Sequence, residues 1–168
     1  RNIYLFSPED AAAIRRELNI PVHDDTTIYR DFFDFLEERD YTLSYKMPFM
    51  ISLIDNLNSI GEAEADKVLD DYIAFYTDRL DRGLAADRAS CPYTYEYLSD
   101  RKAVKKNMLA NPFEKFERKR FMYYSKDLGK LALNTALFNS LKSEDFKRIR
   151  NQMEEDLKEY YSGIENKG

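Results

Sequence analysis

The spacing of the apolar residues constrains this chain more than any other feature. Over most of its length, apolar side chains recur every three or four residues, which is the spacing of one face of an α-helix. After Arg120 this spacing gives way to two short β-prone runs, 121–124 and 131–133, and the turn between them has Gly129 near its end. The change of period predicts a mainly α-helical chain with one short β-hairpin at about 121–134.

The helices can be placed from their apolar stripes and from the residues that start or stop a helix. Ser7 and Pro8 predict a helix start, because serine caps helices and proline suits the first helical position. Asn111-Pro112 predicts an interruption, since proline disfavours helical geometry in the residue before it. Helices are therefore expected at 7–18, 27–38, 47–57, 62–80, about 99–109, 113–120 and 143–161, with a short helical or irregular segment at 134–141.

The order of these elements suggests a fold. Residues 47–57, 62–80 and about 100–120 give three helices followed by a hairpin, which is the order of a winged-helix module. The expected loop at 84–95, with Tyr93, Tyr95 and Tyr97 as packing anchors, is long for such a module. The predicted fold class is mainly α, with a winged-helix-like core of three helices plus a short β-hairpin, and flanking helices. The predicted divisions are an N-terminal helical segment (1–45), the winged-helix-like core (46–141), and a C-terminal helix and tail (142–168).

Positive charge is concentrated in one part of an acidic chain. The net charge is −5, but residues 101–130 hold ten basic and three acidic residues, so this window is +7 and the rest is −12. One interpretation is a solvated helix face. The other is a strip that contacts nucleic-acid phosphates, because phosphate binding needs local positive surface. The candidates are Lys105, Lys106, Lys115, Arg118, Lys119 and Arg120 on the third helix, with Lys126 and Lys130 at the wing.

The sequence gives little support for catalysis within these 168 residues. A single histidine, His23, and a single cysteine, Cys91, argue against a His-based metal cage, a Ser-His triad or a cysteine-rich zinc site. Neither a glycine-rich phosphate loop nor a Gly-x-Ser-x-Gly elbow is present. We therefore expect no enzyme activity, no metal and no cofactor. The lack of a signal peptide or a long apolar run predicts a cytoplasmic protein without a membrane partner. The initial arginine suggests a fragment of a longer protein.

Three stretches carry a resemblance to a known family. They are DRLDRGL (78–84), YTYEYL (93–98) and, above all, NPFEKFERKRFMYYSKD (111–127). They resemble the C-terminal accessory region of bacterial DEAD/DEAH-type superfamily II helicases, including those related to restriction-enzyme motor subunits, over about residues 45–161. The resemblance implies that the parent protein is an ATP-dependent nucleic-acid motor, whose motor domains are partners of this region. It places no ATP chemistry here.

Two functional hypotheses follow. The first is a non-catalytic accessory domain that binds or positions DNA for a helicase or restriction-type motor. The second is an interaction or regulatory module that docks on the motor or on a partner subunit. The exposure of the basic strip distinguishes the two hypotheses. DNA binding needs the strip exposed to solvent, whereas a structural role would pair its residues with acids of other helices.

Overall fold

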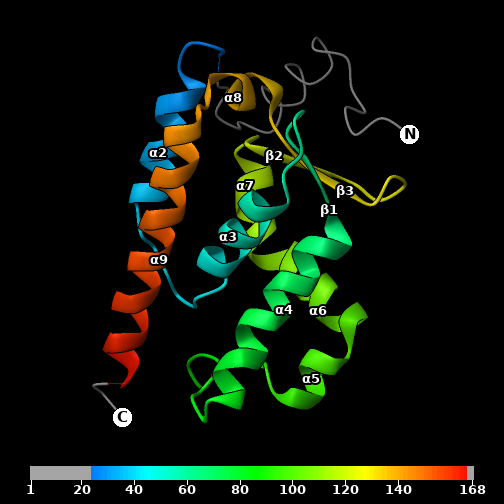
Figure 1. Cartoon of the computed structure of the whole chain (residues 1–168), viewed down its shortest axis with the longest axis vertical. Coiled ribbons are helices and arrows are strands. Elements are labelled where there is room, and N and C mark those ends of the chain that lie inside the picture. Colours follow the sequence, from blue (N-terminus) through cyan, green and yellow to red (C-terminus); the bar gives the residue numbers. More distant parts are fainter. Residues whose placement is uncertain (1–23, 166–168) are drawn as a thin grey trace.

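The computed structural model of the chain describes residues 24–165. Most of these residues are helical, and one small antiparallel sheet lies at one side of the helices (Figure 1). In chain order the elements are α2 (Ile28–Glu37), α3 (Lys46–Asn56), β1 (Glu62–Glu64), α4 (Ala65–Asp81), α5 (Tyr95–Ser99), α6 (Arg101–Met108), the π-helical turn η1 (Leu109–Phe113), α7 (Glu114–Arg118), β2 (Met122–Ser125), β3 (Lys130–Leu133), α8 (Thr135–Ser140) and α9 (Ser143–Glu165). The mainly α prediction is confirmed. The helix predicted at 7–18, His23 and the last residues of the tail lie outside the described residues.

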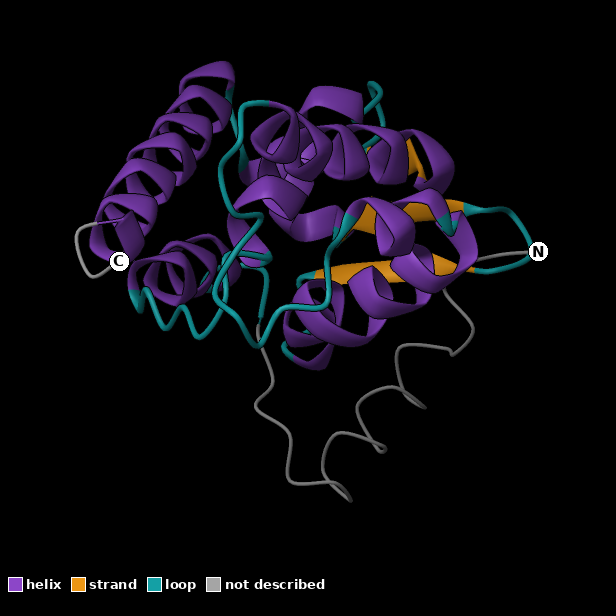
Figure 2. Cartoon of the chain, turned by 90° about the horizontal axis from the view of Figure 1, so that it is seen from below, coloured by secondary structure: helices purple, strands orange, loops and turns teal. Residues whose placement is uncertain are grey.

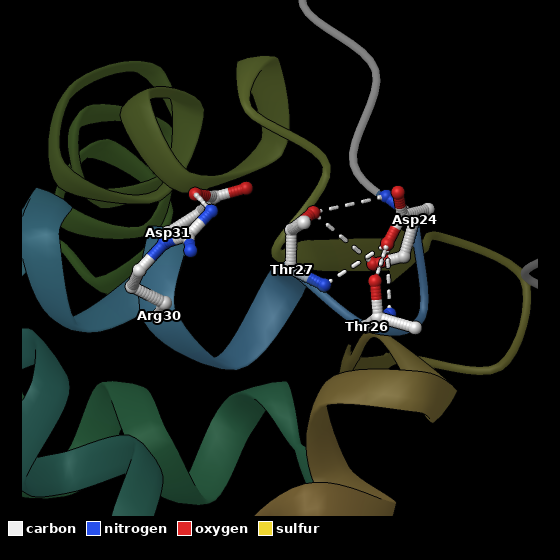
Figure 3. A network of polar contacts seen from close by, with 5 residues as sticks. All are labelled: Asp24, Thr26, Thr27, Arg30 and Asp31. Carbon is white, nitrogen blue, oxygen red and sulfur yellow. Dashed lines mark hydrogen bonds and ion pairs between the residues drawn. The ribbon is translucent and has the colours of Figure 1, made fainter.

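An aspartate orders the turn that leads into α2. Asp24 Oδ1 accepts hydrogen bonds from the Thr26 hydroxyl (2.6 Å) and from the amides of Thr26 (2.8 Å) and Thr27 (3.0 Å) (Figure 3). The bond from the Thr26 hydroxyl is the main cause that holds the pKa of Asp24 below its usual value. These bonds hold the turn that ends at Thr27, the residue directly before the first residue of α2. α2 matches the helix predicted at 27–38.

Three short strands form the sheet in the order β1–β3–β2. β2 and β3 form the predicted hairpin. β1 pairs with the other edge of β3, placing Ala63 opposite Leu131. The sequence predicts a helix over 62–80. The prediction is wrong for residues 62–64, which form β1, because α4 begins only at Ala65. In Glu62-Ala63-Glu64 the alternation of apolar and acidic residues buries only Ala63, which suits a strand at the sheet edge.

The chain passes Pro112 without leaving its helical path. The α-helix is interrupted at Asn111-Pro112 as predicted, but by the π-helical turn η1 between α6 and α7 rather than by a non-helical break. The chain widens there into a π-helical turn, in which a proline without an N–H group can be accommodated. The Asn111 side chain donates a hydrogen bond to the Asn107 carbonyl at 2.9 Å. A side chain therefore satisfies one backbone acceptor of the widened turn.

α7 ends in a turn that needs a left-handed residue. The Phe121 amide donates to the Phe116 carbonyl at 3.0 Å, and the Arg120 amide donates to the Glu117 carbonyl at 2.9 Å. This pair of bonds defines a Schellman motif, whose left-handed position is usually glycine. Here that position is Arg120, with φ of 65°. The turn aims Phe121 back at the core and starts β2.

Phenylalanines join α2, α3, α7 and the start of the hairpin. Phe35 packs edge-on against Phe116, and Phe32 against Phe121, each with ring centroids 5.2 Å apart. Phe49 lies 6.0 Å from Phe116. All five rings are buried. Such aromatic pairs contribute roughly 0.5–1.5 kcal/mol each beyond the area that they bury. This core therefore fixes α7, and the basic residues on it, against α2 and α3.

A second buried region lies beneath the loop between α4 and α5, where α9 ends. Asp87 Oδ2 accepts from the Ser44 amide (2.8 Å) and hydroxyl (2.6 Å), and Asp87 Oδ1 accepts from the Tyr160 hydroxyl (2.7 Å). The Tyr161 hydroxyl donates to the Ala86 carbonyl at 2.6 Å. These bonds tie the loop to the start of α3 and to α9, which lies along α2 in Figure 1.

The three alternating tyrosines of this region have different roles. Tyr93 is buried, and Tyr97 is half-buried against the core, so both are packing anchors as predicted. Tyr95 is 55 % exposed and donates a hydrogen bond to Asp81 at 2.7 Å, so the prediction is wrong for this residue. The reason is that Tyr95 begins α5, whose helical geometry turns it away from Tyr93. Within 24–165, no helix is both long and apolar enough to cross a bilayer.

Candidate nucleic-acid interface

The eight predicted cations lie on α6, on α7 with the turn after it, and on the hairpin. The hairpin turn projects beyond the helices in Figures 1 and 2 and carries Lys126. Three of the eight residues are exposed: Lys106, Arg118 and Lys126. Five are half-buried: Lys105, Lys115, Lys119, Arg120 and Lys130.

Acids on β1 and α4 neutralise one part of this strip. Lys105 Nζ lies 3.1 Å from Asp66, and Lys130 Nζ lies 3.6 Å from Glu62. The Gly129 carbonyl also accepts from the first amide of α4, at 2.8 Å, which holds the hairpin beside this helix. Solvated ion pairs of this kind contribute about 0–1 kcal/mol, so a phosphate could replace either carboxylate at small cost. Lys105 and Lys130 therefore face one acidic segment, although they are 25 positions apart in the printed sequence.

The α7 part of the strip lies near the end of α2. Lys119 Nζ is 5.5 Å from the centre of the Phe35 ring, and Lys115 lines a cavity that also contains Lys46. Arg118 pairs with Glu114 on its own helix, at 2.8 Å. The structure therefore brings Lys115 and Lys119 together with a third lysine, and apart from the acids that hold Lys105 and Lys130.

Two exposed lysines of the strip have no acidic partner within residues 24–165. Lys106 on α6 and Lys126 at the hairpin turn form no ion pair with any residue of the described part of the chain. A cation that is exposed and unpaired can approach a phosphate without first breaking an ion pair. These two residues are thus the strongest candidates in the strip for first contact with an anionic polymer.

Sequence reasoning missed Lys46, which is the most deeply buried cation of this region. Its side chain is 6 % exposed, and its Nζ lies 4.1 Å from the centre of the Phe35 ring. Burial lowers the pKa of Lys46 to about 8, which the nearby Glu38 partly counteracts and Lys115 reinforces. A signal was present in the sequence, because Lys46 interrupts an otherwise apolar run between Tyr45 and Met50.

The other reactive side chains lie away from the strip. Cys91 is half-buried, and the Tyr45 hydroxyl lies 3.4 Å from its sulfur. Burial raises the pKa of the Cys91 thiol, which disfavours the nucleophilic thiolate. Among residues 24–165, no three His, Cys, Asp or Glu side chains are grouped so that they could hold a metal ion.

Comparisons with known proteins give no match. The sequence matches no protein-family model, and neither a curated protein nor a solved structure is significantly similar to it.

Proposed function

We propose that this chain is a winged-helix-like accessory domain that contacts DNA without strong sequence preference. The chain order α3–β1–α4, then α6–η1–α7, then the β2–β3 hairpin supports the fold assignment. So does the strand order β1–β3–β2, in which a strand between the first two helices pairs with the hairpin. In such modules the third helix enters the major groove and the wing touches the backbone.

The location of the positive charge carries this proposal. The +7 window of residues 101–130 falls on the third helical segment and on the projecting hairpin, and nowhere else in the chain is there a comparable excess. Lys106 and Lys126 are exposed and unpaired within the described residues, and Arg120 lies between them in sequence. Arg120 occupies a left-handed position at which glycine would cost less, so the domain presents this cation at the expense of backbone strain.

Each part of the strip has a role in this proposal. Lys105, Lys106 and the α7 cations contact phosphates beside the third helix, and Lys126 and Lys130 contact the backbone from the wing. Phosphate contacts supply affinity but carry no sequence information. The acidic remainder of the chain limits the affinity to the non-specific range, about 10⁻⁴ to 10⁻⁶ M at physiological salt.

The motor is part of this proposal through the sequence resemblance alone. In it, the domain is a non-catalytic part of an ATP-dependent bacterial helicase or restriction-type motor of the cytoplasm. The motor domains of the parent chain hydrolyse ATP, and this domain positions the nucleic acid.

One observation favours a second candidate, an interaction or regulatory module that docks on the motor or on a partner subunit. Arg101 pairs with Asp70, Lys105 with Asp66, and Lys130 with Glu62. Acids of β1 and α4 therefore lie within the face that DNA would approach, and they repel phosphates. A mixed surface of paired charges suits a protein partner better than a polyanion.

Fluorescence anisotropy with a labelled duplex of about 20 base pairs separates the two candidates. We expect the wild type to bind at about 50 mM salt and to weaken as salt rises. Reversing Lys106 and Lys126 to Glu should weaken binding at least tenfold and lower the salt slope by about 2, because each lost phosphate contact lowers it by about 1. The matched control reverses Lys147 and Lys158, two exposed lysines of α9.

The control makes the same change in net charge, so it should keep its affinity within about threefold. Circular dichroism on each sample confirms the helical content. No binding by folded wild type, or equal losses in both double variants, would reject the DNA proposal and favour the interaction module.

A further inference from the structure

A small cavity lies where the connector between α2 and α3 faces η1 and α7. Its volume is about 150 Å³, and its wall includes Tyr41, Lys46, Asn111 and Lys115. Ligand pockets for drug-sized molecules span about 300–1,000 Å³, so this cavity suits a single small chemical group. A water molecule occupies about 30 Å³ in the liquid, so the cavity has room for a few water molecules or for one small polyatomic group.

The cavity wall contains a buried cation whose charge is poorly compensated. Lys46 is 6 % exposed, and its Nζ makes one long hydrogen bond, 3.4 Å to the Phe35 carbonyl. It also faces the rings of Phe35 at 4.1 Å, Tyr41 at 5.7 Å and Phe116 at 5.8 Å. No carboxylate among residues 24–165 forms an ion pair with it. An ammonium group has three donors, so at least one N–H of Lys46 lacks a partner in a site where an unpaired charge is costly.

Neighbouring groups add positive charge and hydrogen-bond donors. Lys115 lines the same cavity and is close enough to Lys46 to disfavour its protonated form. The Asn111 amide uses one N–H on the Asn107 carbonyl, which leaves its second N–H for a ligand. Asp40 also lines the cavity, but it is exposed, so water screens its charge. Asp156 of α9 is buried and also acts on Lys46, but its two oxygens already accept from Arg39 (3.0 Å) and from the Tyr41 hydroxyl (2.6 Å). The acids near Lys46 are thus solvated or bonded to other donors, and none forms an ion pair with it among the described residues.

We propose that this cavity binds one phosphate group between Lys46 and Lys115, with Asn111 as a further donor. Phosphate is a small polyatomic group, and its size is within what the cavity can hold. A free or terminal phosphate carries about −1.5 to −2 charges near neutral pH and matches two ammonium groups, whereas a carboxylate or a backbone phosphodiester balances only one. The site differs from the exposed strip because its main residue is a buried lysine of α3. The phosphate is either free in solution, at the end of a nucleic-acid strand, or part of the strand backbone.

The test uses inorganic phosphate and thermal unfolding of the whole chain, with ionic strength held constant by chloride. At phosphate concentrations about ten times Kd, binding should raise the Tm of the wild type by roughly 3–6 °C. Lys46→Met should abolish this rise, because methionine fills the space beside the surrounding aromatic rings but carries no charge. Lys115→Ala, a change at the cavity wall, should weaken phosphate binding at least tenfold. Lys158→Met on α9 is the control and should respond like the wild type.

Several results would overturn the proposal. They are no Tm rise in the wild type, an equal rise in the wild type and the Lys46→Met and Lys115→Ala variants, or a rise with acetate as large as with phosphate. If phosphate binds, competition identifies the source. Displacement only by a 5′-phosphorylated oligonucleotide indicates a terminal phosphate, and displacement by the 5′-hydroxyl form as well indicates the backbone. Binding of inorganic phosphate without competition from either oligonucleotide indicates free phosphate. Because the first test contains no DNA, it does not depend on the proposed function.

Discussion

Replacing Lys46 by methionine should change how the stability of the domain depends on pH. The pKa of Lys46 is lowered from 10.5 to about 8, chiefly by burial against the α2 and α7 rings. The folded state therefore releases this proton at lower pH than the unfolded state does. Between about pH 8 and 10.5 the unfolded state binds more protons, so stability rises with pH there. For these two pKa values, linkage gives a gain of about 2 kcal/mol between pH 7 and 9.5.

Lys46→Met has no proton to release, so it should lack this gain. At pH 7 the variant should be at least as stable as the wild type, because a methionine replaces a buried ammonium group that forms no ion pair among residues 24–165. By pH 9.5 the wild type should have gained about 2 kcal/mol relative to the variant. Buried tyrosines titrate at higher pH, and the difference between the two proteins cancels their effect.

Urea unfolding followed by circular dichroism, in phosphate-free buffers at about five pH values, measures this difference. Lys158→Met, which removes an exposed lysine of α9, is the control and should run parallel to the wild type. A difference between wild type and Lys46→Met that stays constant within about 0.5 kcal/mol would refute the reasoning. Lys46 would then be solvated or ion-paired in solution.

Three further substitutions test the packing. Asp87→Asn should lower the free energy of unfolding in urea by about 2–4 kcal/mol, because an amide nitrogen cannot accept the hydrogen bonds that Ser44 donates at 2.8 Å and 2.6 Å. A loss of stability below about 1 kcal/mol would contradict this. Gly61→Ala should lower the free energy of unfolding by about 2–4 kcal/mol, since φ is +81° and the new Cβ would lie 2.7 Å from the Phe138 ring. An unchanged Tm would contradict that contact. Arg120→Gly should raise the free energy of unfolding by about 0.5–1 kcal/mol, because glycine adopts the left-handed conformation of this position without strain. The same change should weaken DNA binding in the anisotropy assay. A lower stability would mean that no strain is stored at this position.

The sequence predicts the helices well because their apolar stripes are long and regular. α9 buries Ile149, Met153 and Leu157 as expected, and α4 buries Leu69 and Tyr72. A stripe of this length is a local signal, since each position follows from helical geometry. The hairpin at 121–134 could also be found, because the period changes there and the turn contains a glycine.

The core departs from the prediction at two places, where strand pairing or helix winding depends on distant residues. Three residues are too few to show a period, so β1 is visible only through its pairing with β3, about seventy positions later. Pro112 is a strong signal for a helix end, but burial of Phe113 and Phe116 keeps the segment packed and a π turn accommodates the ring. In both places tertiary contacts override the local preference.

The sequence located the basic strip but not its electrostatic surroundings. Charges can be counted along the chain, so all eight candidates could be named. Whether Lys105 meets Asp66, or Lys130 meets Glu62, depends on how β1 and α4 lie against α6 and the hairpin. The role of Lys46 is equally non-local, because its cavity forms between the connector before α3 and the π turn.

These partners divide the strip into two electrostatic environments. Beside α4, Lys105 and Lys130 are paired with carboxylates, and an approaching phosphate must displace them. Near the end of α2, Lys115 lies beside Lys46 with no ion pair between Lys46 and a described acid, so a phosphate there adds the missing charge. If the strip acts as one surface, Lys46→Met should weaken DNA binding as well as phosphate binding. If the two environments act separately, the reversal of Lys106 and Lys126 should remove DNA binding while inorganic phosphate still raises Tm.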